Sequence, residues 1–166
     1  MGMIRRYADY FDTYEGVRVA NICGSCGKKA VPLTILGAEV TIFDISEDNK
    51  RYALETAKEA NAYIDFEVCD VLEIDLDKYG GYFDVVFMEG GVLHSFHDID
   101  EFIRIMYNLL NDNGKLICSD FHPFTKLSGE ELLRAYGEGK RRIEVEEMLG
   151  ISFDNAKRTV KRSRSL

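Results

Sequence analysis

A short glycine-containing loop carries the residues whose types and spacing are best suited to chemistry. The apolar run that begins at Val17 ends at Ile22, Gly24 and Gly27 follow, and Asp44 ends the next apolar run. A strand, a loop and a helix in this order present backbone N–H groups to a ligand, and a carboxylate after the next strand can accept hydrogen bonds from a ribose. The spacing therefore predicts a site for a ligand that contains a ribose.

A dinucleotide is one candidate ligand for this loop. The dinucleotide fingerprint is G-x-G-x-x-G, in which glycines let the backbone approach the pyrophosphate. Only Gly24 and Gly27 are glycine here, with Cys23, Ser25 and Cys26 around them. This interpretation is weakened, although a glycine pattern alone discriminates poorly.

Thiol chemistry is a second candidate, because Cys23 and Cys26 form a C-x-x-C pair just before a helix. That position lowers a thiol pKa, as redox motifs require. However, no second C-x-x-C is present and the three histidines lie far away in the sequence. The alternative is that both cysteines are small apolar residues in a tight loop.

The elements that position these residues alternate between strands and helices. Apolar runs predict strands at 17–22, 39–44, 64–70, 83–88 and 115–120, and helical patterns predict helices at 28–36, 46–62 and 98–110. Ser46 and Asp98 are expected helix caps, and the sequence NDNG at 111–114 is strong turn chemistry. Strands alternating with helices of this length predict an α/β, doubly wound, mostly parallel sheet of about five strands, with helices on both faces.

Aromatic residues before the first strand recur at helical spacings, at Tyr7, Tyr10, Phe11 and Tyr14. They predict a short amphipathic helix within residues 3–15. We expect this helix to cover the core of the domain, and the alternative is that it lies over the cofactor cleft.

The loop and the later strand ends together resemble a known family. The string VANICGSCG at 19–27 resembles the first motif of class I S-adenosylmethionine-dependent methyltransferases, commonly V-L-D-L-G-C-G-T-G. Asn21 stands where the family has an acidic residue, Cys23 and Ser25 replace two glycines, and Gly27 is retained. The strings FDVVFMEGGVLH at 83–94 and NDNGKLI at 111–117 resemble later motifs of the family. The resemblance covers residues 17–121 and implies the strand order 3-2-1-4-5 and S-adenosylmethionine as the cofactor.

The resemblance also implies roles for individual residues. Asp44 would accept the ribose hydroxyls, Asp70 at the end of the third strand would bind the adenine amino group, and Val71 would pack near the ring. The full predicted cofactor-binding set is Asn21, Cys23, Gly24, Ser25, Gly27, Asp44, Ile45, Asp70, Val71 and Glu89. No metal site is predicted.

Methyl transfer needs few catalytic side chains. The sulfonium methyl is already activated, so most of the barrier reduction can come from holding the nucleophile, methyl carbon and sulfur in line. If the acceptor carries a proton, a base is useful, and the predicted catalytic residues are Glu89 and His94, with His97 as a further candidate. His122 could also line the acceptor side. The predicted reaction is methyl transfer to an unidentified small-molecule acceptor.

Bulk properties favour one main domain. The 166 residues have a formal net charge of -8, and no run is apolar enough for a membrane span or a signal peptide. The four cysteines without a secretory signal indicate reduced thiols and a cytoplasmic protein. We predict a core with its N-terminal helix at 1–124 and a helical, basic tail at 125–166, without the last two strands that the family usually has.

The tail suggests a second function. Residues 125–166 hold 10 of the chain's 21 Lys and Arg but 7 of its 29 Asp and Glu. Residues 138–162 resemble a helix-turn-helix of the sigma-factor type, which implies nucleic-acid binding by a regulator with a methyltransferase-like scaffold. An amphipathic helix that covers the sheet edge or forms a homodimer is the alternative, since the fifth strand would otherwise be an exposed edge.

Overall fold

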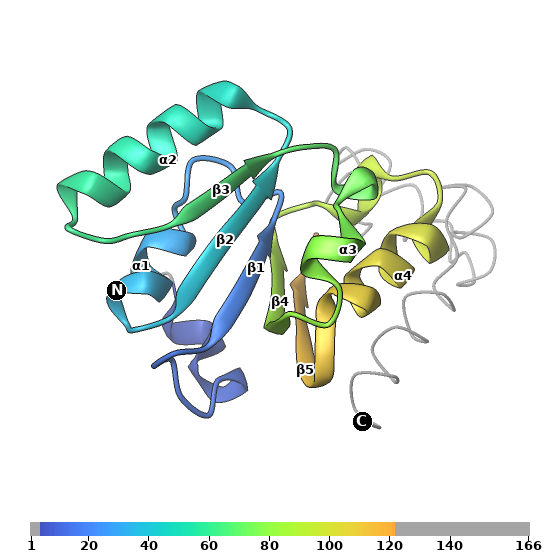
Figure 1. The fold of residues 1–166 in the computed structure, drawn as a ribbon, viewed down its shortest axis with the longest axis horizontal. Coiled ribbons are helices and arrows are strands. Elements are labelled where there is room, and N and C mark those ends of the chain that lie inside the picture. Colours follow the sequence, from blue (N-terminus) through green and yellow to red (C-terminus); the bar gives the residue numbers. More distant parts are fainter. Residues whose placement is uncertain (1–3, 122–166) are drawn as a thin grey trace, which may run out of the picture. The chain divides into compact units, whose positions relative to one another are not determined.

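The computed structural model describes residues 4–121, which lie almost entirely in the first compact unit of the chain, Met1–Asp120. Its centre is a sheet of five strands (Figure 1): β1 Arg18–Ile22, β2 Glu39–Asp44, β3 Asp65–Val68, β4 Phe83–Glu89 and β5 Leu110–Ser119. The order is β3-β2-β1-β4-β5 and every neighbouring pair is parallel. The predicted sheet and its strand order are confirmed.

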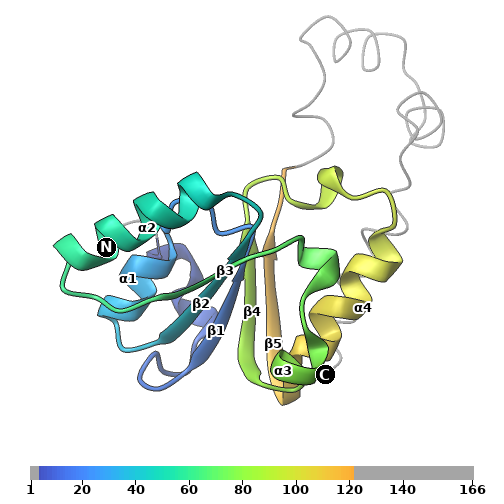
Figure 2. The ribbon, with the colours of Figure 1, turned by 45° about the horizontal axis from the view of Figure 1, so that its top comes forward.

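Helices cover both faces of this sheet, as predicted. The helices α1 Ala30–Ile35 and α2 Glu47–Glu59 lie on one side, and α3 Leu76–Tyr79 and α4 Ile99–Leu109 lie on the other (Figure 2). On the α1 side, Val19, Ile42 and Phe87 pack with Ala30 and Ala53. On the α4 side, a second core holds Ile22, Phe43, Met88, Phe102 and Met106. Alternate residues of each strand therefore supply alternate cores, because successive strand side chains point to opposite faces.

The predicted helix caps are present. Ser46 Oγ accepts a hydrogen bond of 3.2 Å from the backbone N–H of Asn49, and Asp98 Oδ1 accepts one of 2.9 Å from that of Glu101. Each cap satisfies a backbone donor that has no partner within its helix. Pro32 is the third residue of α1, within the first turn, where its missing N–H removes no helical hydrogen bond.

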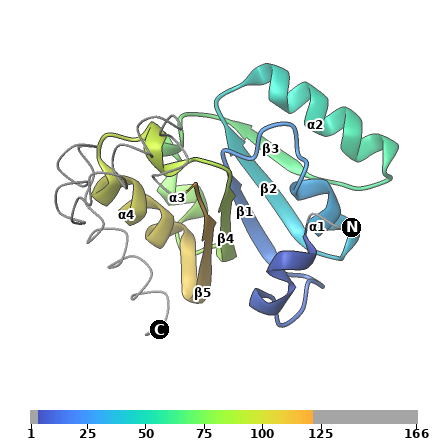
Figure 3. The ribbon, with the colours of Figure 1, turned by 180° about the vertical axis from the view of Figure 1, so that it is seen from behind.

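The aromatic segment before β1 covers the core, as expected, but as the 3-10 helix η1 Arg5–Tyr10. Ile4, Tyr7 and Phe11 are buried with the α1-side core, whereas Tyr10 is exposed. The ring of Tyr7 meets that of Phe87 edge to face, with 4.9 Å between centroids. Seen from behind, η1 lies at the side of the sheet that carries α1 (Figure 3).

The predicted start of the fifth strand at residue 115, after a turn at 111–114, is wrong. The strand begins at Leu110, directly after α4, because Leu110 pairs with Phe83 and packs on the α4-side core. The next pair is Val85 with Lys115, so residues 111–114 bulge out of the ladder. The turn-forming residues lie inside this bulge, where Asn111 Oδ1 accepts a hydrogen bond of 3.1 Å from the N–H of Asn113.

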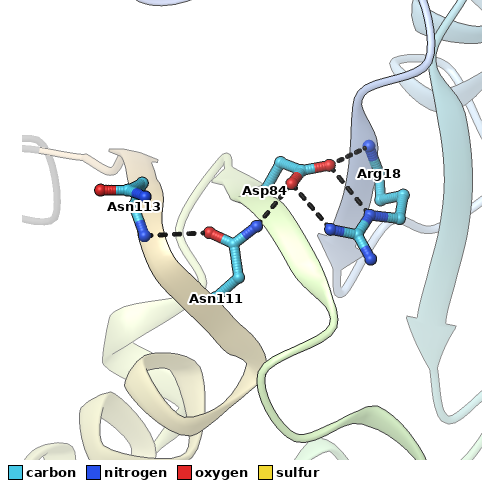
Figure 4. A network of polar contacts seen from close by, with 4 residues as sticks. All are labelled: Arg18, Asp84, Asn111 and Asn113. Atoms are coloured by element: carbon cyan, nitrogen blue, oxygen red, sulfur yellow. Dashed lines mark hydrogen bonds and ion pairs between the residues drawn. The ribbon is translucent and has the colours of Figure 1, made fainter.

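A polar network secures the amino-terminal ends of three strands (Figure 4). The carboxylate of Asp84 accepts hydrogen bonds from Nε and NH2 of Arg18 at 3.0 and 2.9 Å, and from the N–H of Arg18 at 2.8 Å. Asn111 Nδ2 donates to Asp84 Oδ1 at 2.5 Å. These hydrogen bonds from Arg18 lower the pKa of Asp84 and raise that of the guanidinium. The bulge is thus joined to β1 through β4.

Three short helical segments were not predicted: η2 Val71–Glu73, α3, and η3 Leu93–Ser95. Each is too short for a helical period to be visible in the sequence. Among the residues described, no helix is both long and apolar enough to cross a bilayer. His122 and the predictions for residues 125–166, including the helix-turn-helix and the missing last strands, lie outside the described residues.

Candidate functional site at the carboxyl edge of the sheet

The carboxyl ends of the strands gather polar side chains at one edge of the sheet. Because all five strands are parallel, the loop after β1 and the acidic residues at or just after the ends of β2, β3, β4 and β5 share that edge; these residues are Asp44, Asp70, Glu89 and Asp120. Open α/β sheets bind their ligands there. The predicted cofactor residues therefore belong to one edge of the fold.

The loop after β1 has a backbone conformation that favours glycine at two positions that are not glycine. Cys23 has φ 49° and Ser25 has φ 52°, both in the left-handed region, and Gly27 has φ 77°. A non-glycine residue pays about 1–2 kcal/mol for this conformation. Strained backbone of this kind is concentrated at functional sites, because the surroundings must hold it in place.

Gly24 allows a close approach inside the same loop. A Cβ at this position would lie 2.7 Å from Asn21 Oδ1 and 2.9 Å from Ile42 Cγ2. Asn21 is 3% exposed, its Nδ2 donates to the carbonyl oxygen of Phe87 at 3.4 Å, and its Oδ1 has no hydrogen-bond partner. The loop thus lies directly on a buried amide oxygen with unused acceptor capacity.

Asp44 ties the loop to the second helix. Its Oδ2 accepts a hydrogen bond of 2.9 Å from the N–H of Ser25. Its Oδ1 accepts one of 3.1 Å from the N–H of Ser46 and one of 3.0 Å from Nδ2 of Asn49. Asp44 is 8% exposed, so these hydrogen bonds offset the cost of burying its charge. Asp44 therefore organises the loop.

The thiols near the loop are poorly suited to thiolate chemistry. Burial, with the negative charges of Asp44 and Asp70, raises the pKa of Cys23 to about 11. Burial also raises the pKa of Cys69, with a further contribution from Glu67. Cys23 and Cys69 pack against the α4-side core. Their environment is that of small apolar residues, and no group of metal-ligating side chains occurs within residues 4–121.

The side chains after β2 and β3 offer polar and apolar surfaces. Ile45 is 73% exposed next to Asp44. Asp70 is exposed, and its Oδ1 accepts a hydrogen bond of 2.9 Å from the N–H of Leu72, while Val71 is buried. An exposed apolar side chain at the same edge as two carboxylates can contact a base while the carboxylates accept hydrogen bonds.

Glu89, at the end of β4, lies between two cations. Its Oε2 is 2.8 Å from Nζ of Lys29, and its Oε1 pairs with the guanidinium of Arg6. The Glu89 side chain is 16% exposed and Lys29 is 19% exposed, whereas Arg6 is largely exposed. Burial, with the nearby charge of Arg6, lowers the pKa of Lys29. The two ion pairs of Glu89 therefore join the N-terminal segment and the start of α1 to the end of β4.

His94 and His97 follow in an exposed turn. Gly90 and Gly91, with φ 97° and 91°, lead from β4 into η3, and His94 is the second residue of that helix. The turn is held to the end of β5, since Asp120 Oδ2 accepts a hydrogen bond of 2.7 Å from the N–H of Leu93. The structure thus brings Glu89 and His94 to the same edge as the cofactor loop.

Sequence reasoning missed three residues of this edge: Arg6, Lys29 and Asn49. Asn49 follows the helix cap Ser46 by three residues, which makes its backbone donor predictable but not the contact of its side chain with Asp44. Lys29 is the N-cap of α1, and Arg6 comes from a segment that we expected to cover the core, with a position over the cofactor cleft as the alternative. Neither position carries a local pattern that indicates a pairing with Glu89.

This edge and this strand order define a Rossmann-like α/β protein of the class I methyltransferase type. Residues 22–118 match the model of a methyltransferase domain family, and the chain belongs to that family. The predicted family is therefore confirmed, whereas nothing in the matches supports the resemblance to a sigma-factor helix-turn-helix.

Individual relatives agree with this assignment. The chain is 30% identical over 123 residues to a ubiquinone biosynthesis O-methyltransferase of Mesorhizobium japonicum, covering 74% of this chain and 48% of that protein. Solved structures with this fold include a Pyrococcus horikoshii protein, with TM-score 0.62, 24% identity and coverage of 70% and 54%. An S-adenosylmethionine-dependent methyltransferase of Mesorhizobium loti has TM-score 0.63, 20% identity and coverage of 74% and 54%. The chain spans about half the length of these relatives.

Proposed function

We propose that this protein is an S-adenosylmethionine-dependent methyltransferase and that residues 4–121 supply its cofactor site. The observation that supports this most directly is the loop after β1. Its backbone is left-handed at Cys23 and Ser25, where the family has glycine. Asp44 accepts the N–H of Ser25, and the carbonyl oxygen of Phe43 accepts that of Cys23. Strained positions that the surroundings hold in place cluster at ligand sites, which favours a working cofactor loop.

The residues present fit the cofactor by their chemistry. Asp44 has one acceptor position left on Oδ2 for a ribose hydroxyl, and Asp70 has an exposed carboxylate for the adenine amino group. Ile45 and Val71 would contact the ring. Asn21, Cys23, Gly24, Ser25 and Gly27 would line the methionyl part, where Asn21 Oδ1 is an unused acceptor.

The cofactor, when bound, supplies an activated methyl group, and the chain supplies orientation and electrostatics. We place Glu89 and His94 on the acceptor side. Because Glu89 is paired with Lys29 and Arg6, it is suited to fixing charge and geometry at the end of β4. His94 is exposed and is better suited to accept a proton from the acceptor. The acceptor is a small molecule, and the name of the curated relative makes a hydroxyl oxygen the first acceptor atom to test.

Calorimetric titration with S-adenosylhomocysteine tests the cofactor assignment. We expect saturable binding by the full chain and binding weaker by about tenfold or more after Asp44→Ala. Asp48→Ala is the matched control, since it removes the same charged group four residues further along the chain, in α2, where the side chain is 78% exposed. A folded wild-type protein that takes up no ligand at millimolar concentration would exclude the proposal.

Two partners predicted from the sequence stay predictions. Nucleic-acid binding through residues 125–166 would appear as salt-dependent DNA binding that is lost when residues 138–166 are deleted. A homodimer that covers β5, the last described strand, would appear as a concentration-dependent mass in sedimentation equilibrium.

A further inference from the structure

Asn49 makes a contact with Asp44 that the cofactor assignment does not use. Its Nδ2 donates a hydrogen bond of 3.0 Å to Asp44 Oδ1. Its own backbone N–H donates to Ser46 Oγ at 3.2 Å, so the residue is fixed in the first turn of α2. Asn49 is half-buried, and it is the one residue of the described range whose side chain is seen to donate to this carboxylate.

The acceptor positions of Asp44 are nearly all occupied by the protein. An ionised carboxylate offers about four lone-pair positions, two on each oxygen. Ser46 and Asn49 take the two on Oδ1, and Ser25 takes one on Oδ2. A single position on Oδ2 remains for a ligand. Its direction depends on the rotation of the carboxylate, which the two donors on Oδ1 hold in place.

We propose that Asn49 is a positioning residue for the cofactor. By fixing Oδ1 of Asp44, it directs the remaining lone pair of Oδ2 toward a hydroxyl of the ribose. The inference rests on the proposed function, because it needs a ligand with a ribose at this edge. Ser46 and Ser25 donate through their backbone N–H groups, which any residue except proline would supply. The hydrogen bond from the side chain of Asn49 is therefore the one donor to Asp44 that a substitution can remove.

Titration with S-adenosylhomocysteine at pH 8 tests the role of Asn49. Asn49→Ala leaves Oδ1 of a buried carboxylate short of one donor, and we expect the dissociation constant to rise by about five- to twentyfold. Arg51→Gln is the control: it lies on the same helix, its side chain is 58% exposed, and its pairing partner is Asp48. This variant should bind as the wild type does.

Asn49→Asp gives a signature that a merely structural residue would not give. At pH 8 the introduced carboxylate repels Asp44, and we expect binding weaker than that of Asn49→Ala. Two adjacent carboxyls retain a proton more readily than one, so at pH 5.5 the introduced group becomes a donor to Oδ1 and binding should recover at least fivefold. Cys23 and Cys69, whose pKa values the charge of Asp44 raises, are the same in all variants. A carboxylate in the first turn also favours the helix, so this variant should fold.

The outcomes separate the two proposals. Binding by Asn49→Ala that equals or exceeds the wild type, or weak binding by Asn49→Asp that does not recover at pH 5.5, overturns the role of Asn49 and leaves the cofactor assignment intact. Absence of binding by the folded wild type overturns both. Both Arg51→Gln and Asn49→Asp make the net charge more negative by one. If the two variants lost the same affinity for S-adenosylhomocysteine, net charge would explain the loss, and the role of Asn49 would be overturned.

Discussion

The backbone N–H of Ser25 donates a hydrogen bond of 2.9 Å to Oδ2 of Asp44, across 19 residues of sequence. Ser25 itself is exposed and has φ 52°, so a single carboxylate holds a strained position in the loop of the proposed site. Loop and acidic residue are thus one structural unit, and the conformation of one depends on the other.

Substitution of Ser25 should reveal the strain. Ser25→Gly removes a left-handed penalty of about 1–2 kcal/mol, offset by the greater unfolded-state entropy of glycine of about 0.5–1 kcal/mol. We therefore expect the free energy of unfolding, measured with urea, to rise by up to about 1.5 kcal/mol. Ser25→Ala retains the Cβ and should bring no gain. Equal stability of the two variants would show that the loop is not strained at this position.

The network at the opposite edge should make stability depend on acid pH. The pKa of Asp84 is lowered by Arg18, so its contribution is fully present above the ordinary carboxyl pKa and is lost as the pH falls through the lower, folded value. Asp84→Asn should cost about 1–2 kcal/mol at pH 7, at the low end for bonds to a charged group because the side chain is 33% exposed.

The difference between wild type and Asp84→Asn should shrink below pH 4 in urea titrations. Asp112→Asn, an exposed change of the same kind on β5, serves as the control and should have little effect at any pH. A cost for Asp84→Asn that stays constant down to pH 2 would contradict an ionic origin.

Two substitutions of Tyr7 should separate what its ring and its hydroxyl contribute to the stability of the fold. The side chain is buried, and its hydroxyl has no hydrogen-bond partner. Tyr7→Phe keeps the contact with Phe87 and removes an unsatisfied polar atom, so we expect stability equal to the wild type or higher by about 1 kcal/mol. Tyr7→Ala leaves a cavity and should cost about 3–5 kcal/mol. Calorimetric melting of both variants checks this, and a destabilised Tyr7→Phe would indicate a partner for the hydroxyl.

Cys23 should react slowly with iodoacetamide. With its pKa raised to about 11, on the order of one molecule in a thousand carries the thiolate at pH 8. Mass spectrometry of the folded protein should find a modification rate that rises about tenfold per pH unit between pH 7 and 10. Rapid modification at pH 7, or a reversible disulfide between Cys23 and Cys26 after mild oxidation, would instead support the thiol interpretation.

The sheet and most of the edge follow from local patterns in the sequence. Alternating apolar strands and capped helices such as the one after Ser46 identify the elements, and a parallel sheet then brings Asp44, Asp70 and Glu89 to one edge. The start of β5 could not be predicted in this way, because the pairing of Leu110 with Phe83 outweighs the turn preference of Asn111. Contacts over long separations, such as Lys29 with Glu89, have no local signal either.

The left-handed backbone at Cys23 and Ser25 also bears on how such loops are found in genomes. A motif search that demands glycine at both positions would pass over this chain, although the path of its backbone is the one that glycine permits. In this loop two torsion angles, and the acceptors that hold them at Asp44 and Phe43, take the place of two glycines.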